Sequence, residues 1–139
     1  MYEVDIQGLF DTLNHGDLRR CLDRRVRDGV LRRTIDKWLK AGVLDGGQVI
    51  HPEMGTPQGG VLSPLLANLY LHEVLDVWCE DVVTPRLQGA AFLIRYADDI
   101  IIVCGREDDA RYVATVVPER FGLYALTLHP EKTRLHPFR

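Results

Sequence analysis

Two adjacent aspartates, Asp98 and Asp99, stand between apolar runs of strand length over 90–96 and 100–104. This pattern predicts a tight antiparallel hairpin with both acids at its tip. Two neighbouring carboxylates in a partly apolar setting resist ionising together, and a divalent cation removes that difficulty. Mg²⁺ suits such oxygen ligands, because it keeps several waters and takes one or two carboxylates together with substrate phosphates. Taken alone, however, the pair fits an ordinary surface turn better.

A third acid, Asp5, is expected to end a hydrophobic strand over 2–6, where apolar and charged residues alternate. In a sheet of split βαβ order the first strand lies centrally beside the hairpin, so Asp5 and Asp98 would meet at one edge of the sheet. Three carboxylates converging there can hold two metal ions about 3.5–4 Å apart, which stabilises the attacking and leaving oxygens of phosphoryl transfer. The alternative for Asp5 is a solvated acid at a strand end.

A glycine-rich loop over 55–60 precedes the best helix of the chain, which begins at Ser63 and Pro64. Its glycines allow the backbone to approach a ligand closely, and the helix start can offer backbone donors to a nucleotide or nucleic-acid group. No Gly-Lys-Ser/Thr follows, so the loop is not a P-loop. A plain connector explains the loop nearly as well.

A basic segment over 19–40 could contact phosphates, although solvated helix faces explain it equally well. It holds nine basic residues against three aspartates. The basic residues are Arg19, Arg20, Arg24, Arg25, Arg27, Arg32, Arg33, Lys37 and Lys40. Lys132, between Glu131 and Thr133, indicates by itself only a structural role. The five histidines form no ligand pattern.

Caps, breakers and periodicity predict the remaining elements. Asn14 and Asp17 mark the start of a helix that should run to about Asp28 and end at Gly29. We further expect a helix over 31–40, a hairpin over 43–50, a helix from 63 to about 82, a helix over 107–121 and a strand over 124–128. Without an insertion at about 8–61, the order is the split βαβ arrangement of a ferredoxin-like sheet. One α+β domain is therefore expected over 1–139.

The composition is typical of a soluble globular domain, with 139 residues, 46% hydrophobic and 27% charged content, and a net charge of −3. This balance gives no overall positive field that would indicate nucleic acid. Three cysteines without CxxC or zinc spacing predict reduced thiols in a cytoplasmic protein. Neither a membrane helix nor a signal peptide is expected. Strand-like pieces at both ends suggest a segment of something longer.

Four stretches of the chain resemble motifs of one family. Residues 96–99 resemble the YADD box of reverse transcriptases, and residues 55–68 closely resemble a stretch found in reverse transcriptases encoded by group II introns. Residues 5–11 resemble the first catalytic box of that family, and residues 126–133 resemble its late lysine box. These motifs stand in the right order and cover nearly the whole chain. The sequence therefore resembles a group II intron-type reverse transcriptase/maturase.

The resemblance implies a polymerase palm, with a partly helical insertion on the fingers side, that acts as an RNA-directed DNA polymerase. Asp5 and Asp98 would be the principal ligands of two Mg²⁺ ions, for which Mn²⁺ could substitute. Asp99 would lie beside them, and the Ile6 carbonyl would assist. Lys132 would lie near the departing pyrophosphate and donate a proton to it. A primer 3′-oxygen would attack the α-phosphorus in line, and pyrophosphate would leave.

The resemblance also implies how substrates are selected. Phe10 would lie under the sugar and exclude a 2′-hydroxyl, which selects deoxynucleotides by sterics. Gln58 and Gly59 would line the pocket for the incoming nucleotide and the template base. The implied partners are an RNA template, a DNA primer, deoxynucleoside triphosphates and an intron RNA, with no membrane.

Two departures from the family pattern stand out. Ala125 occupies a position where the family is expected to use glycine, and we expect this change to alter only strand packing. The fingers, thumb and X segments are missing from the chain, so we expect the isolated chain to be weak or inactive. Apolar surface left where fingers and thumb would dock favours self-association.

Alternative functions are kept open. The chain could be a non-catalytic RNA-binding remnant that uses the basic helices over 19–40, although its intact acids argue against decay. It could be another palm enzyme, such as a nucleotide cyclase, against which the glycine loop and the late lysine box argue. Retron and CRISPR-associated reverse transcriptases remain alternative relatives.

Overall fold

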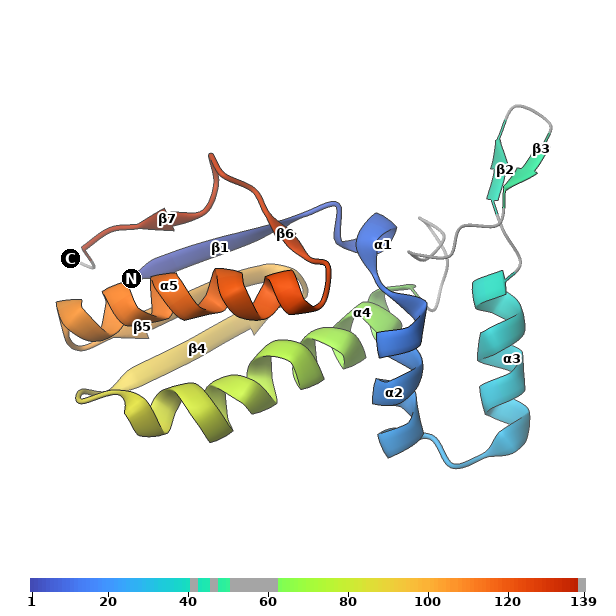
Figure 1. The fold of residues 1–139 in the computed structure, drawn as a ribbon, viewed down its shortest axis with the longest axis horizontal. Coiled ribbons are helices and arrows are strands. Elements are labelled where there is room, and N and C mark those ends of the chain that lie inside the picture. Colours follow the sequence, from blue (N-terminus) through green and yellow to red (C-terminus); the bar gives the residue numbers. More distant parts are fainter. Residues whose placement is uncertain (41–42, 46–47, 51–62, 138–139) are drawn as a thin grey trace.

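The computed structural model describes residues 1–40, 43–45, 48–50 and 63–137. Within these residues, five strands form one antiparallel sheet in the order β4-β5-β1-β6, and β7 also pairs with β1. The strands are β1 (Tyr2–Gln7), β4 (Ala91–Tyr96), β5 (Asp99–Cys104), β6 (Thr127–Leu128) and β7 (Arg134–Leu135). Two further strands, β2 (Val43–Asp45) and β3 (Gln48–Ile50), form a separate hairpin, as the sequence predicts (Figure 1).

Helices flank the sheet and extend beyond it. The α-helices of the described residues are α1 (Leu9–Thr12), α2 (His15–Arg25), α3 (Gly29–Lys40), α4 (Ser63–Leu71) and α5 (Glu107–Leu123). The helix that begins as α4 continues through π turns over His72–Asp76 and Cys79–Val83 and then a 3₁₀ turn over Thr84–Arg86. Figure 1 shows α5 and this long helix alongside the sheet, whereas α2 and α3 stand to one side. The protein is therefore an α+β fold with an antiparallel sheet.

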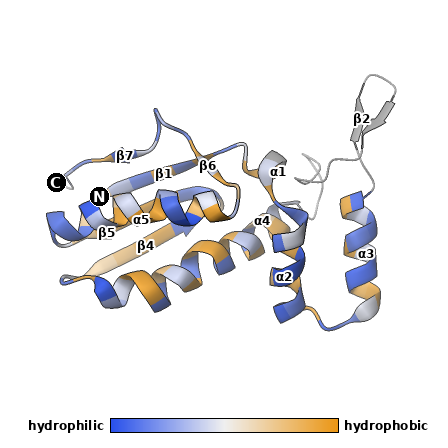
Figure 2. Ribbon diagram, in the orientation of Figure 1, coloured by the Kyte–Doolittle hydropathy of each residue, from blue (hydrophilic) through white to orange (hydrophobic). Residues whose placement is uncertain are grey.

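The core lies between one face of the sheet and the two long helices. Alternate residues of β1, which are Tyr2, Val4 and Ile6, are buried. They belong to the same hydrophobic cluster as the buried side chains of α5, which include Val113, Val117 and Phe121. The other face of the sheet is open, and β4 exposes Phe92, Ile94 and Tyr96 on it. Figure 2 shows the hydrophobic residues along α4 and β4, and mainly hydrophilic residues along α2.

The start of α2 confirms its prediction, but its end does not. The Asn14 side chain accepts a hydrogen bond from the backbone N–H of Asp17 at 3.0 Å. The helix ends at Arg25, and Asp28 caps the start of α3: its carboxylate accepts the Leu31 N–H at 2.8 Å. Gly29 is therefore the first residue of α3 and does not terminate α2.

The end of α5 corrects the expectation for Ala125 and for the strand over 124–128. Ala125 has a φ of 56°, in the left-handed region that favours glycine. Its N–H bonds the Gly122 carbonyl at 3.3 Å, and the Leu126 N–H bonds the Phe121 carbonyl at 3.0 Å, the pairing of a Schellman helix end. The final strand is therefore confined to Thr127–Leu128, and Ala125 affects the backbone of the turn rather than strand packing.

The three cysteines carry free thiols. Cys21 and Cys79 are free and buried, and Cys104 is free and half-buried. Burial raises the pKa of the Cys79 thiol to about 12, so this thiol stays protonated at neutral pH. In the part of the chain that the structure describes, every helix is too short or too polar to cross a membrane.

Candidate active site at the hairpin turn

The antiparallel pairing of β1 with β5 places Asp5 directly opposite Asp99. Tyr96 also pairs with Asp99, so Ala97 and Asp98 form a two-residue turn between β4 and β5. The structure thus brings Asp5 and the Ala97–Asp98 turn together at one end of the sheet. Asp5 does not end its strand, however, because Ile6 and Gln7 continue β1 by pairing with β6.

Asp5 and Asp99 form a cross-strand pair, and Asp98 lies beside them in the turn. The three carboxylates do not form the converging group that the sequence predicts. Among the described residues, no group of three or more His, Cys, Asp or Glu side chains is placed to hold a metal ion. Asp98 lies in the turn, directly before Asp99, which begins β5. Like charges directly opposite each other destabilise an antiparallel pair, so Asp5 and Asp99 gain from any cation between them.

The turn after β6 closes over Asp5 from the other side. Lys132 Nζ lies 3.6 Å from Asp5 Oδ2, and the His129 N–H donates to the Asp5 carbonyl at 2.8 Å. The Lys132 side chain is 64% exposed, so this ion pair contributes little stability and the ammonium can leave. The structure therefore brings together two of the predicted site residues from opposite ends of the chain.

The residues after Asp5 enter a short helix through a glycine. Gly8 has a φ of 58° and precedes α1, which carries Phe10. The Phe10 ring is half-buried against the core, five residues after Asp5. The Ile6 side chain is buried beneath the sheet. The predictions for Gln58, Gly59 and the rest of the loop over 55–60 lie outside the described residues.

Sequence reasoning missed one residue at this end of the sheet, Arg95. Its guanidinium donates to both carboxylate oxygens of Asp76, at 2.9 and 2.7 Å, to the Asn68 side chain at 2.9 Å and to the Ala97 carbonyl at 2.9 Å. The available signal was an arginine between the apolar residues of a strand whose inward positions should be apolar.

The basic segment over 19–40 is largely paired within the fold. Five of its nine basic residues have acidic partners. The pairs are Arg19 with Asp36, Arg20 with Asp17, Arg24 and Arg25 with Glu73, and Arg32 with Asp23. All of these pairs except Arg20 with Asp17 connect α2 to α3 or to the long helix, so they favour a structural role for most of the segment.

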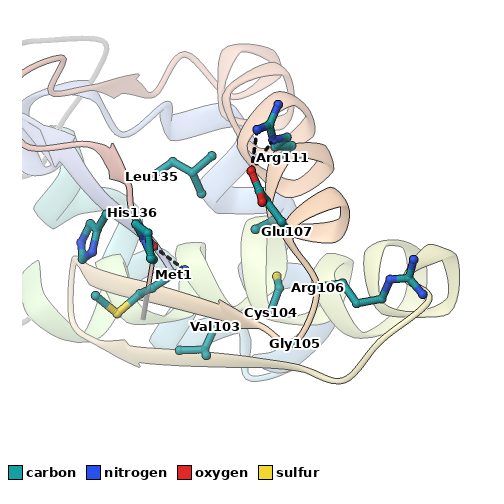
Figure 3. A pocket seen from close by; sticks show the side chains of 11 residues that line it. Met1, Val103, Cys104, Gly105, Arg106, Glu107, Arg111, Leu135 and His136 are labelled. Carbon is teal, nitrogen blue, oxygen red and sulfur yellow. Dashed lines mark hydrogen bonds and ion pairs between the residues drawn. The ribbon is translucent and has the colours of Figure 1, made fainter. Parts of the chain in front are cut away.

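A large pocket lies at the other end of the sheet (Figure 3). Its volume is about 670 Å³, and it is lined by residues of both chain ends, the end of β5 and the start of α5. Figure 3 shows Met1, Cys104 and His136 among its walls. Because β5 begins at Asp99 and ends at Cys104, this pocket is not part of the acid-bearing site.

Comparisons with known proteins give matches over most of the chain. The family described as "Reverse transcriptase (RNA-dependent DNA polymerase)" matches residues 1–137. The chain is 47% identical over 72 residues to the "Group II intron-encoded protein LtrA" of Lactococcus lactis, which covers 52% of this chain and 12% of that protein. It is 35% identical over 88 residues to the "Putative COX1/OXI3 intron 1 protein" of Saccharomyces cerevisiae, covering 63% of this chain and 10% of that protein.

A more distant relative covers more of the chain. Identity is 27% over 139 residues with the "Retrovirus-related Pol polyprotein from type-1 retrotransposable element R2" of Popillia japonica, covering 93% of this chain and 23% of that protein. The matched segments thus make up less than a quarter of the length of these relatives.

Proposed function

The chain belongs to the reverse transcriptase family, in its group II intron-encoded type, and we propose that it is the polymerase palm of such an enzyme. The observation that carries this proposal is the pairing of Asp5 with Asp99 beside the Ala97–Asp98 turn, with Lys132 Nζ 3.6 Å from Asp5. Two carboxylates across adjacent strands and one exposed cationic side chain suit the transfer of a nucleotide.

The proposed reaction is attack by the 3′-oxygen of a DNA primer on the α-phosphorus of a deoxynucleoside triphosphate. The new bond joins that oxygen to the α-phosphorus, the bond to the bridging oxygen breaks, and pyrophosphate leaves. Lys132 donates a proton to the pyrophosphate as charge develops on it. Before the substrate binds, the ion pair with Asp5 holds the Lys132 ammonium at the place where the phosphates would react.

Carboxylate oxygens at this site fit Mg²⁺, and the reverse transcriptase family generally uses divalent metal ions. Asp5 and Asp98 would be the principal ligands, with Asp99 and the Ile6 carbonyl beside them. Two Mg²⁺ ions, or Mn²⁺ in their place, supply stabilisation of charge on the attacking and leaving oxygens when bound. The repulsion between the paired carboxylates of Asp5 and Asp99 supports a cation at this site, because a cation offsets it.

We also propose that the fold is a split βαβ palm of the ferredoxin-like type. The strand order β4-β5-β1-β6, with the long helix and α5 packed on one face, supports this arrangement. Residues 1–139 then form a single palm domain, and the segment at about 8–61 is an insertion on the fingers side.

The proposed substrates are an RNA template, a DNA primer and deoxynucleoside triphosphates, and an intron RNA is a further proposed partner. Phe10 would contact the sugar and exclude a 2′-hydroxyl, while Gln58 and Gly59 would contact the incoming nucleotide and the template base. By itself the chain should be weak or inactive, because it matches less than a quarter of the length of its relatives. Self-association through exposed apolar surface is a related expectation.

Primer extension on an RNA template with Mg²⁺ tests the proposal. Three proteins are compared: this chain, a chimera in which it replaces the matching segment of the LtrA relative, and the same chimera with Asp98→Ala. We expect extension by the chimera and a loss of at least about a thousandfold with Asp98→Ala. Asp81→Ala, at an exposed acid of the long helix, serves as the matched control and should extend primers normally.

Two results would overturn the proposal. One is an Asp98→Ala chimera that extends primers as well as its parent, which would remove Asp98 from the site. The other is a folded, inactive chimera that binds RNA through the exposed Arg33 and Lys37 of α3, which would favour the alternative of a non-catalytic RNA-binding protein.

A further inference from the structure

Arg95 is an unusual residue for its position in β4. It points toward the helices rather than toward the open face, and its side chain is only 13% exposed. A buried guanidinium is costly unless its donors are paired. Here the cost is offset, because Asp76 binds the guanidinium through both carboxylate oxygens.

The remaining donors of Arg95 connect the acid-bearing turn to α4. Nη1 donates to Asn68 Oδ1 and to the Ala97 carbonyl, each at 2.9 Å. Asn68 lies on α4, the helix that follows the glycine-rich loop, and Ala97 is the first residue of the acid-bearing turn. One planar group therefore holds the turn against that helix.

The π turn over His72–Asp76 explains why both anchors reach Arg95. Asn68 and Asp76 are eight residues apart, which in a regular α-helix would place them about 80° apart around the axis. A π turn uses more residues per turn and reduces that angle. The two side chains can therefore meet the same guanidinium.

Ala97 is the part of the turn that needs support. Its φ is 54°, a left-handed conformation that is unfavourable for an alanine. The carbonyl of Ala97 belongs to the same rigid peptide group as the N–H of Asp98. A hydrogen bond that fixes this carbonyl therefore fixes the direction in which Asp98 leaves the turn.

We infer that Arg95 is a positioning residue that holds the strained Ala97–Asp98 peptide and thereby aims the Asp98 carboxylate. This inference rests on the proposed function of Asp98. Arg95 itself contacts no reacting atom. It acts through the turn, and Asp76 and Asn68 hold it in place.

The first test measures catalysis in the chimera. Arg95→Lys keeps the charge but cannot reach Asp76, Asn68 and Ala97 together. We expect kcat to fall by about 100-fold, the effect of an ångström-scale misplacement, while KM for the nucleotide changes less than about threefold. Arg111→Lys, which alters an exposed ion pair with Glu107, is the matched control and should leave kcat unchanged.

A rescue separates positioning from a general structural role. Glycine adopts a positive φ without the steric cost that alanine has, so Ala97→Gly should restore kcat of the Arg95→Lys chimera at least about fivefold. If Arg95 only connected β4 to the long helix, glycine in the turn would not restore kcat. Unchanged kcat in Arg95→Lys, or the absence of rescue by Ala97→Gly, would overturn the inference.

A spectroscopic measurement on the 139-residue chain is independent of activity. In ¹⁵N relaxation, the order parameter of the Asp98 amide should fall from about 0.85 in the native chain to below about 0.6 in Arg95→Lys. The amide of Ile101 should stay rigid in both. If Arg95→Lys does not fold, Asn68→Ala removes one anchor and should lower the same order parameter by less. A rigid Asp98 in these variants would contradict the inference. An inactive native chimera with the expected relaxation change would instead count against the proposed function alone.

Discussion

Two turns of this protein hold an alanine in the left-handed conformation, and they are stabilised in different ways. Ala97 has a φ of 54° in the turn between β4 and β5, and Ala125 has a φ of 56° at the end of α5. In each turn a side chain donates to a backbone carbonyl: Arg95 to Ala97, and Tyr70 to Tyr124 at 3.1 Å. Both donors depend on α4, which carries Tyr70 and one anchor of Arg95.

The difference lies in what else supports each turn. At the end of α5, the backbone bonds of the Schellman pairing support Ala125, and the next residue, Leu126, is buried. At the hairpin turn, Tyr96 is 82% exposed, and Asp99 is exposed as well. The Ala97 carbonyl accepts its hydrogen bond from the Arg95 guanidinium. Strain at a helix end that backbone hydrogen bonds stabilise serves the fold, whereas strain beside exposed acids points to a functional site. Substitutions near the first turn should therefore alter chemistry, and those near the second should alter stability.

At the acid-bearing end, a change in substrate selectivity is expected from Phe10. Phe10→Val in the chimera should relax discrimination against ribonucleotides by at least about tenfold, because the smaller side chain leaves room for a 2′-hydroxyl. The measurement compares kcat/KM for matched ribonucleotides and deoxynucleotides. Phe92→Val, at an exposed phenylalanine of β4, is the control. Unchanged selectivity in Phe10→Val would remove Phe10 from the sugar site.

A smaller effect, on stability alone, is expected at the end of α5. Tyr70→Phe removes the hydrogen bond to the Tyr124 carbonyl and should lower the free energy of unfolding by about 1–2 kcal/mol. Urea unfolding of the 139-residue chain measures this change. Primer extension by the chimera should stay within about twofold of the parent at 25 °C, where the folded state still dominates. A strong loss of kcat without loss of stability would contradict the separation between the two turns.

The same tyrosine gives a pH dependence. Burial raises the pKa of Tyr70 above its ordinary value of 10.0, so the folded protein keeps the phenol proton at pH values where the unfolded chain loses it. Its contribution to stability is therefore complete below pH 10 and is lost as the pH rises above 10. Urea unfolding at a series of pH values should show a shallower decline above pH 10 for Tyr70→Phe than for the native chain. An equal decline in both would contradict this linkage.

The smallest effect is expected from glycine at the two strained positions. Ala125→Gly should raise the free energy of unfolding by about 0.5–1 kcal/mol, because glycine removes the steric cost of the positive φ but adds flexibility to the unfolded chain. Ala97→Gly should give a similar gain, since its φ is nearly the same. Thermal unfolding measures both. Destabilisation by either glycine would show that the native turn is not left-handed in solution.

Local signals predicted the elements well. Asn14 caps α2 as its type suggests, and the apolar runs flanking Asp98 and Asp99 do form a hairpin. These features depend on residues close together in the sequence, where caps and turn chemistry act. The glycine expected at position 125 also indicated a backbone conformation, a positive φ. The end of α5 in the structure shows why that conformation is needed there.

The parts that could not be predicted depend on long-range pairing. The register that places Asp99, rather than Asp98, opposite Asp5 is fixed by how two distant strands align. Arg95 meets partners 19 and 27 residues away, and the π turn that aligns them has no sequence signal. The structural role of Arg24 could not be predicted either, because its partner Glu73 lies 49 residues away in the sequence.

The most direct test asks whether Asp5 and Asp98 act on the same reacting centre. Single-nucleotide incorporation is measured for the chimera with Asp5→Asn, with Asp98→Asn and with both. If the two carboxylates work as one unit, the incorporation rate falls about a thousandfold or more in each single variant. In the double variant it falls no more than about tenfold below the rate of the less active single variant. Losses that multiply in the double variant, or an Asp5→Asn chimera with normal activity, would contradict a shared site across β1 and β5.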